Sequence, residues 1–193
     1  SYGMRATNGG TVVNNGTISV YGENANGSGG IWATGATNST GSSIYSNVDI
    51  TDKNGKIYIE RTSGDGQTIG VKLENNSIIK IGDIGNAGNS QILIKDTRDG
   101  DDNYSIGIKR DSMSKIEGTE NKDSFGKPTI IISGKNNIGY YYPPQSSDSN
   151  AVTGKIYIQI PFNNDNNKAS SSATNKVITS QSNDFPSGET PKE

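Results

Sequence analysis

The densest group of side chains that could do chemistry is a run of carboxylates between positions 96 and 102. It consists of Asp96, Arg98, Asp99, Gly100, Asp101 and Asp102. Oxygen-rich loops that contain glycine can bind calcium, but this run lacks the EF-hand spacing and its bidentate glutamate. The calcium-binding nonapeptide repeat is also missing. We therefore favour a structural or solvated loop over a calcium site, and we expect no metal and no cofactor.

Side chains for catalysis are otherwise few. The sequence contains neither histidine nor cysteine, which removes imidazole bases, thiolate nucleophiles, disulfides and the usual zinc ligands. Polysaccharide-cleaving enzymes place carboxylates over a groove, and Asp83 and Glu117 could in principle face one another. Solvated turn carboxylates explain these two residues better. We expect a protein that is not an enzyme, and a polysaccharide-active enzyme is the distant alternative.

The composition limits the possible partners. The 18 basic and 20 acidic residues give a formal net charge of -2, so no global field gathers nucleic acid or an anionic membrane. Only 29% of the residues are hydrophobic, yet they gather into short β-branched clusters such as residues 56–59 and 129–132. A slim core is the expectation. No secretory signal or transmembrane run is present, so we expect a piece of a larger protein that does not itself insert into a membrane.

A recurring pattern predicts the elements that must position these side chains. A glycine followed by an apolar or aromatic residue and then a basic or aromatic one begins at Gly3, Gly30, Gly70, Gly107 and Gly139. A second apolar position fits three of these repeats, at Val12, Ile79 and Ile116. Each repeat then closes with two apolar residues on one side of a strand, namely Ile18/Val20, Ile57/Ile59, Ile92/Ile94, Ile130/Ile132 and Ile156/Ile158. Self-similar strands with polar turns between them are typical of a β-solenoid.

The predicted fold is therefore all-β, a right-handed parallel β-helix of about five coils with inserted loops. No stretch keeps a helical period, and an all-β sandwich is the alternative. We expect the β-helix over residues 1–162 and a low-complexity polar tail or inserted loop over 163–193. Insertions are expected at 34–47, 95–105 and 143–153, and the coils that start at Gly30 and Gly139 are the least regular.

The alternation of each strand also predicts two ladders of outward side chains. In the strand that closes each coil, the residue between the two apolar positions points outward, which gives the ladder Tyr58, Leu93, Ile131 and Tyr157. For this ladder we favour structural cover by the chain over an interface with a partner. The other is the third position of the triplet, which mixes cations with aromatic rings: Arg5, Trp32, Lys72, Lys109 and Tyr141. This second ladder could hold an acidic protein or a glycan, or could simply stabilise an exposed sheet.

Residues 2–18 and 69–77 resemble the passenger repeats of large bacterial type V autotransporter adhesins, the fusobacterial kind in particular. The resemblance covers roughly residues 1–160 and rests on the glycine-apolar element and the turn Asn14-Asn15-Gly16-Thr17-Ile18. It implies display at the bacterial outer membrane surface and attachment to a host protein or glycan, or to another bacterium. A purely structural spacer that holds a distal tip away from the cell is the alternative function.

Overall fold

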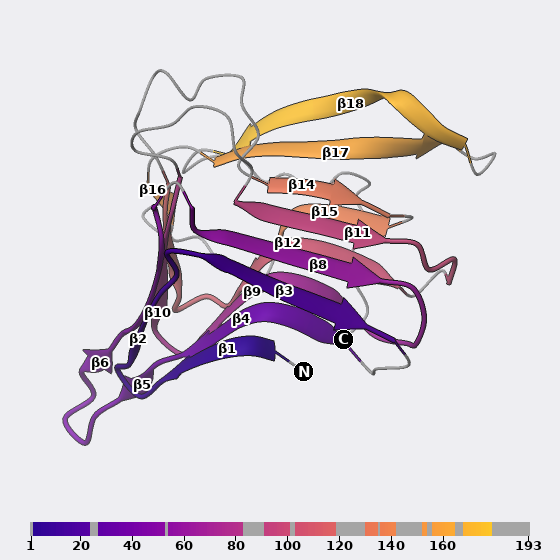
Figure 1. Ribbon diagram of the computed structural model, residues 1–193. Coiled ribbons are helices and arrows are strands. Elements are labelled where there is room, and N and C mark those ends of the chain that lie inside the picture. Colours follow the sequence, from indigo (N-terminus) through magenta and orange to yellow (C-terminus); the bar gives the residue numbers. More distant parts are fainter. Residues whose placement is uncertain are drawn as a thin grey trace.

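The computed structural model describes residues 2–23, 27–52, 54–82, 91–100, 103–118, 130–134 and 136–141, and the backbone of strands at 152–153, 156–164 and 168–178. Every regular element in these ranges is a β-strand (Figure 1). Among the residues described, no helix is long and apolar enough to cross a membrane. The prediction of an all-β chain is confirmed for this part of the sequence.

The strands form three main sheets, which we call A, B and C. Sheet A contains β1 (Tyr2–Thr7), β4 (Ser28–Thr34), β9 (Thr68–Glu74), β12 (Tyr104–Arg110) and β15 (Asn136–Tyr141). Sheet B contains β2 (Thr11–Val13), β7 (Ser46–Ile50), β10 (Ser77–Ile81), β13 (Lys115–Glu117) and β16 (Val152–Thr153). Sheet C contains β3 (Thr17–Gly22), β8 (Lys56–Arg61), β11 (Ile92–Asp96), β14 (Ile130–Ser133), β17 (Ile156–Asn164) and β18 (Lys168–Ile178).

The chain visits sheets A, B and C in turn, and we call each such passage a coil. Each strand pairs in parallel with its counterpart in the neighbouring coils, and the exception within these three sheets is the antiparallel pair β17–β18. Asparagine and glycine make the tight connections: Asn8 and Gly9 have φ of 51° and 85° between β1 and β2. Asn75 and Asn76, at 49° and 65°, repeat this left-handed turn between β9 and β10.

Among the described residues a slim main core runs between the three sheets, as the composition predicts. Its members are apolar residues that point inward at the same level in successive coils. The predicted pairs Ile57/Ile59, Ile92/Ile94 and Ile130/Ile132 are buried, and Ile18 and Val20 pack against the same core while partly exposed. Val12, Ile79 and Ile116 face it from sheet B, joined in register by Val48.

The recurring glycine has a packing reason. A Cβ on Gly107 would lie 2.5 Å from the carbonyl oxygen of Gly139 and 2.7 Å from Cγ2 of Ile130. A Cβ on Gly70 would lie 2.7 Å from Cγ2 of Ile92 in the same way. Sheet A therefore leaves space at this position, and an isoleucine of sheet C fills it.

The insertion predicted at 34–47 is a short antiparallel hairpin of β5 (Ala36–Thr37) and β6 (Ser43–Ile44), which projects from the sheets (Figure 1). Its tip is held by Oδ1 of Asn38, which accepts hydrogen bonds from Oγ1 of Thr40 at 2.7 Å and from the backbone of Ser42 at 2.8 Å. The insertion explains why the second coil departs from the repeat spacing. Of the segment predicted as an insertion at 143–153, only β16 falls within the described residues.

The predicted register is wrong in the fifth coil. Ile130 pairs with Ile158, and Ile131 pairs with Gln159, two residues beyond the predicted partners. Tyr157 instead pairs with Val177 of β18. A shift of two residues keeps the same side chains on each face of a strand. The alternation of apolar and polar residues therefore does not determine which of the two registers forms. Strands β17 and β18 also extend into the segment predicted as a polar tail, while the domain boundary at residue 162 stays a prediction.

Candidate partner-binding face on sheet A

The predicted ladder of cations and aromatic rings is one continuous column on sheet A. Each member pairs with the next across neighbouring strands, from the first coil to the fifth. We call it the cation–aromatic column, and it consists of Arg5, Trp32, Lys72, Lys109 and Tyr141. The in-register stacking is confirmed. Arg5 is exposed and the other four members are half-buried.

The members of this column contact one another through cation–π geometry. The guanidinium carbon of Arg5 lies 4.0 Å from the centre of the Trp32 ring, and Nζ of Lys72 lies 5.3 Å from it. Nζ of Lys109 lies 5.3 Å from the ring centre of Tyr141. Each such contact at an exposed site contributes about 0.5–1 kcal/mol. The column is thus a set of mutually oriented side chains.

Glu74 of β9 fixes two members of the column. Its Oε2 accepts a hydrogen bond from the indole Nε1 of Trp32 at 2.8 Å, and its Oε1 lies 2.7 Å from Nζ of Lys72. Both partners of the ion pair keep about a quarter to a third of their side-chain surface exposed, at 25% and 31%, so it adds little to stability. Its effect is to hold the indole and the ammonium group in one orientation.

Tyr2 extends the aromatic surface beside Trp32. The two ring centres lie 5.6 Å apart at an interplanar angle of 40°. Gly29, the residue opposite Tyr2 on β4, leaves the space that the Tyr2 ring occupies. Burial, and secondly the negative charge of Glu74, raise the pKa of Tyr2 to about 12. The phenol is therefore a neutral hydrogen-bonding group at physiological pH.

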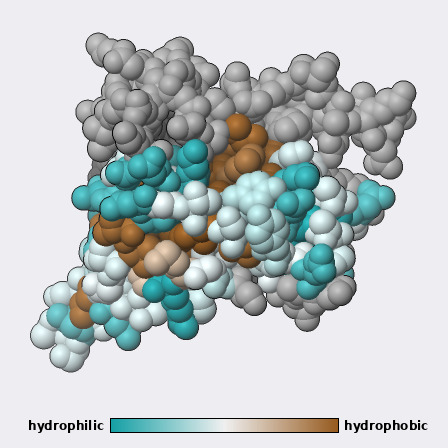
Figure 2. All heavy atoms as spheres, viewed as in Figure 1, coloured by the Kyte–Doolittle hydropathy of each residue, from teal (hydrophilic) through white to brown (hydrophobic). Residues whose placement is uncertain are grey.

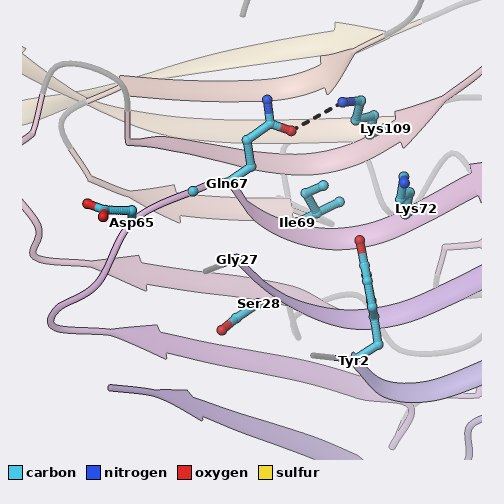
Figure 3. Close-up of a pocket in the computed structure, with 9 residues that line it drawn as sticks. Tyr2, Gly27, Ser28, Asp65, Gln67, Ile69, Lys72 and Lys109 are labelled. Atoms are coloured by element: carbon cyan, nitrogen blue, oxygen red, sulfur yellow. Dashed lines mark hydrogen bonds between the residues drawn. The ribbon is translucent and has the colours of Figure 1, made fainter. Parts of the chain in front are cut away.

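A groove of about 490 Å³ opens beside the column (Figure 3). The side chains of Tyr2 on β1 and of Ile69 and Lys72 on β9 line it, and Gln67 and Lys109 line it farther along. Oε1 of Gln67 accepts a hydrogen bond from Nζ of Lys109 at 3.1 Å. The groove combines an aromatic ring, an aliphatic side chain, two cations and an amide, with the carboxylate of Asp65 at the end away from the lysines. Its Lys72–Lys109 end therefore suits a small polar ligand with negative charge.

The sequence interpretation missed an apolar cluster on the same sheet. Ile69, Ile106 and Ile138 are buried, pair in register, and form a cluster separate from the main core. Tyr104 and Tyr141 pack against them while partly exposed. The signal was present, because an isoleucine precedes each of the last three repeated glycines. The cluster gives one edge of the groove an apolar backing.

The second predicted ladder lies on sheet C. Tyr58, Leu93 and Ile131 pair in register and each is half-buried, whereas Tyr157 does not lie in this column. Figure 2 shows hydrophobic residues gathered on this face over β11 and β14. The predicted ladder is therefore confirmed for three rungs, and its role stays a prediction.

Polar contacts border this sheet C column. The hydroxyl of Tyr58 donates to Oε2 of Glu60 at 2.8 Å, and Nζ of Lys95 lies 3.0 Å from Oε1 of the same carboxylate. These two hydrogen bonds, from Lys95 and from Tyr58, lower the pKa of Glu60. The Tyr21 ring meets the Tyr58 ring edge-on, with centres 5.9 Å apart. One end of the column is thus closed by side chains of the chain itself.

The carboxylate run begins with a buried ion pair. Oδ1 and Oδ2 of Asp96 lie 2.8 Å and 2.7 Å from Nε and Nη2 of Arg98, and Oδ2 also accepts a hydrogen bond from Ser105 at 2.8 Å. Burial alone raises the pKa of Asp96, but the hydrogen bonds from Arg98 and Ser105 outweigh it and the net shift is downward. Arg98 also donates to the Gly66 carbonyl at 2.8 Å. Asp96 thus has a structural role, linking sheet C to sheet A.

The other predicted acidic groups fall partly within the described residues. Asp83, Asp101 and Asp102 lie outside the described residues. Glu117 is on sheet B, with Oε2 3.9 Å from Nζ of Lys80. Within the described residues, no three acidic, histidine or cysteine side chains are placed to hold a metal ion.

Of the nine residues predicted to contact a partner, the structure brings five together on sheet A and three together on sheet C. No family model, curated protein or solved structure matches the chain. The function is therefore argued from the chemistry of the sheet A face. This face joins oriented cations, aromatic rings and a groove on one rigid surface.

Proposed function

We propose that this chain is a segment of a right-handed parallel β-helix from the passenger of a bacterial type V autotransporter adhesin. It lies at the outer membrane surface and attaches to a host cell-surface protein or glycan, or to another bacterium. The parallel sheets visited in turn support the architecture. The resemblance of residues 1–160 to adhesin passengers supports the location and the role.

The observation that carries the binding role is the cation–aromatic column. Five residues from five separate coils meet in register on paired strands. Side chains fixed on strands are more accurately oriented than side chains on loops. Cations and aromatic faces in one strip suit an acidic partner, through charge-assisted hydrogen bonds and ring stacking.

The test is adhesion of the 193-residue chain to cells and its recovery of partners in a pull-down. We expect Trp32→Ala and Tyr141→Ala each to reduce binding by about tenfold, the equivalent of 1.4 kcal/mol. Tyr21→Ala is the matched control, because Tyr21 is an exposed aromatic residue on sheet C. Unchanged adhesion in both sheet A variants, with normal folding, would refute the binding role.

A structural spacer is the second candidate, and the same column offers an observation in its favour. The indole of Trp32 and the ammonium of Lys72 both meet Glu74, and Lys109 meets Gln67. Such internally satisfied cross-strand groups can stabilise an exposed sheet without any ligand. If the chain is a spacer, we expect it to bind neither cells nor a partner in the pull-down. Substitutions in the cation–aromatic column should then lower its stability and leave adhesion unaffected.

The column on sheet C can be tested separately. Leu93→Lys and Ile131→Lys place a charge on half-buried apolar positions. Loss of folding in these variants supports structural cover of the column. Normal folding with lost adhesion supports an interface there. Circular dichroism melting together with the cell-binding assay distinguishes the two results.

A further inference from the structure

We propose that the groove beside the cation–aromatic column binds an acidic saccharide, with its anionic group between Lys72 and Lys109. The inference deepens the proposed function and rests on it for its biological setting. It names the ligand class as a sugar that carries a carboxylate or a sulfate. The groove residues that it uses are Tyr2, Gln67, Ile69, Lys72 and Lys109.

The two lysines set the charge of the ligand. Lys72 and Lys109 stand directly opposite each other on the neighbouring strands β9 and β12. Like charges at opposite positions destabilise a sheet, and paired strands lie only about 4.8 Å apart. An anion between the two ammonium groups removes that repulsion and accepts charge-assisted hydrogen bonds from both. The carboxylate of Asp65 lies away from the two lysines in Figure 3. Glu74 offsets the charge of Lys72, with its Oε1 2.7 Å from Nζ of Lys72, whereas Lys109 donates to the neutral amide of Gln67, so the two lysines together with Glu74 keep a net positive charge.

The other walls suit a sugar ring. Tyr2 presents its ring and hydroxyl group and Ile69 presents an aliphatic surface, both toward the same space (Figure 3). The amide of Gln67, already aligned by Lys109, adds a donor and an acceptor. Alternating apolar faces and neutral polar groups match the C–H faces and hydroxyls of a saccharide. A volume of about 490 Å³ lies within the range of small-ligand sites.

An acidic peptide fits this groove less well. Extended peptides gain affinity by adding a strand to a free sheet edge. Strands β4 and β9, which form the base of the groove, are each paired on both sides within sheet A. Their backbone groups are therefore occupied. A saccharide, which binds through side chains alone, needs no free edge.

The test titrates the whole 193-residue chain with three saccharides. Sialyllactose carries a carboxylate, a heparin-derived hexasaccharide carries sulfates as well, and lactose is neutral. Isothermal titration measures affinity, and the side-chain NMR signals of Gln67 and Tyr2 locate the ligand. We expect one or both acidic saccharides to bind and lactose to give no response, and the better acidic ligand identifies the preferred anion.

Lysine substitutions test whether the positive charges of Lys72 and Lys109 are needed for saccharide binding. The double variant Lys72→Gln/Lys109→Gln is expected to lose affinity by about tenfold or more, because both charge-assisted hydrogen bonds are lost. Lys80→Gln, an exposed lysine on sheet B, is the matched control and should bind as the parent does. Melting curves verify that all three proteins are folded.

Two results would overturn the inference: no response to either acidic saccharide, or equal affinity in the double variant. If the chain adheres to cells but ignores both saccharides, the proposed function stands and this inference fails. If it binds an acidic saccharide through the two lysines but no cell, the groove is assigned correctly and the adhesin role fails.

Discussion

Sheets A and C enclose the same core, but they contribute residues of opposite size to it. Sheet A contributes a repeated glycine within its strands, and sheet C contributes the isoleucines that fill the space, as at Gly107 and Ile130. Their outer faces differ as well. Sheet A carries cations, rings and a groove, whereas sheet C carries a column of apolar side chains. The comparison shows that one repeat can keep a uniform interior while its two outer faces carry different kinds of side chain.

The largest effect on this difference is expected when a buried side chain of sheet C is truncated. Ile92 is fully buried, so Ile92→Ala should lower the free energy of unfolding by about 3–4 kcal/mol through lost burial and a cavity. Leu93, its half-buried neighbour on the outer face, is the control, and Leu93→Ala should cost about 1 kcal/mol. Urea denaturation measures both. Equal losses would mean that the inner and outer faces of β11 are not distinct.

The complementary test adds a side-chain atom at the repeated glycine of sheet A. Gly107→Ala places a Cβ against the backbone of Gly139 and the side chain of Ile130, so we expect a loss of about 2–3 kcal/mol. Gly16→Ala is the control, because nothing lies within 4 Å of the added atom, and its effect should stay within about 0.5 kcal/mol. A neutral Gly107→Ala variant would contradict the packing account of the repeated glycine.

The link between the two sheets should depend on pH. Because the folded-state pKa of Asp96 lies below its ordinary value of 3.8, its stabilisation is present above that value and is lost as the pH falls through the folded pKa. Asp96→Asn should therefore cost about 2 kcal/mol near neutral pH and less in acid. Urea unfolding across the acid range measures the change. A cost that does not vary with pH would contradict the account.

The smallest expected effect concerns the outer face of sheet A. Glu74→Gln removes the negative charge that helps to raise the pKa of Tyr2, so this pKa should fall from about 12 while burial keeps it above its ordinary 10.0. Stability should change by less than about 0.5 kcal/mol. NMR titration of ring-labelled tyrosine measures the shift. Glu117→Gln on sheet B should leave the Tyr2 signal unchanged.

Much of the fold and of the candidate site was predictable from the sequence. Residue alternation in each strand predicted which side chains point inward, and the repeated triplet placed Arg5, Trp32 and Lys72 in one column. Both patterns are local, because a strand sends successive side chains to opposite faces whatever its partner is. The insertion at 34–47 was also predictable, since the coil that starts at Gly30 does not fit the repeat without extra residues.

Other features depend on contacts between distant residues, and only the tertiary structure decided them. The pairing of Ile130 with Ile158 was ambiguous by two residues, because that shift preserves the face of every side chain. The Asp96–Arg98 pair acquires its role from Ser105, which sheet A brings beside it. The groove beside Lys72 and Lys109 likewise requires four strands, β1, β4, β9 and β12, to stack. The sequence by itself determined which face the alternating strand residues occupy, whereas long-range pairing determined which side chains meet.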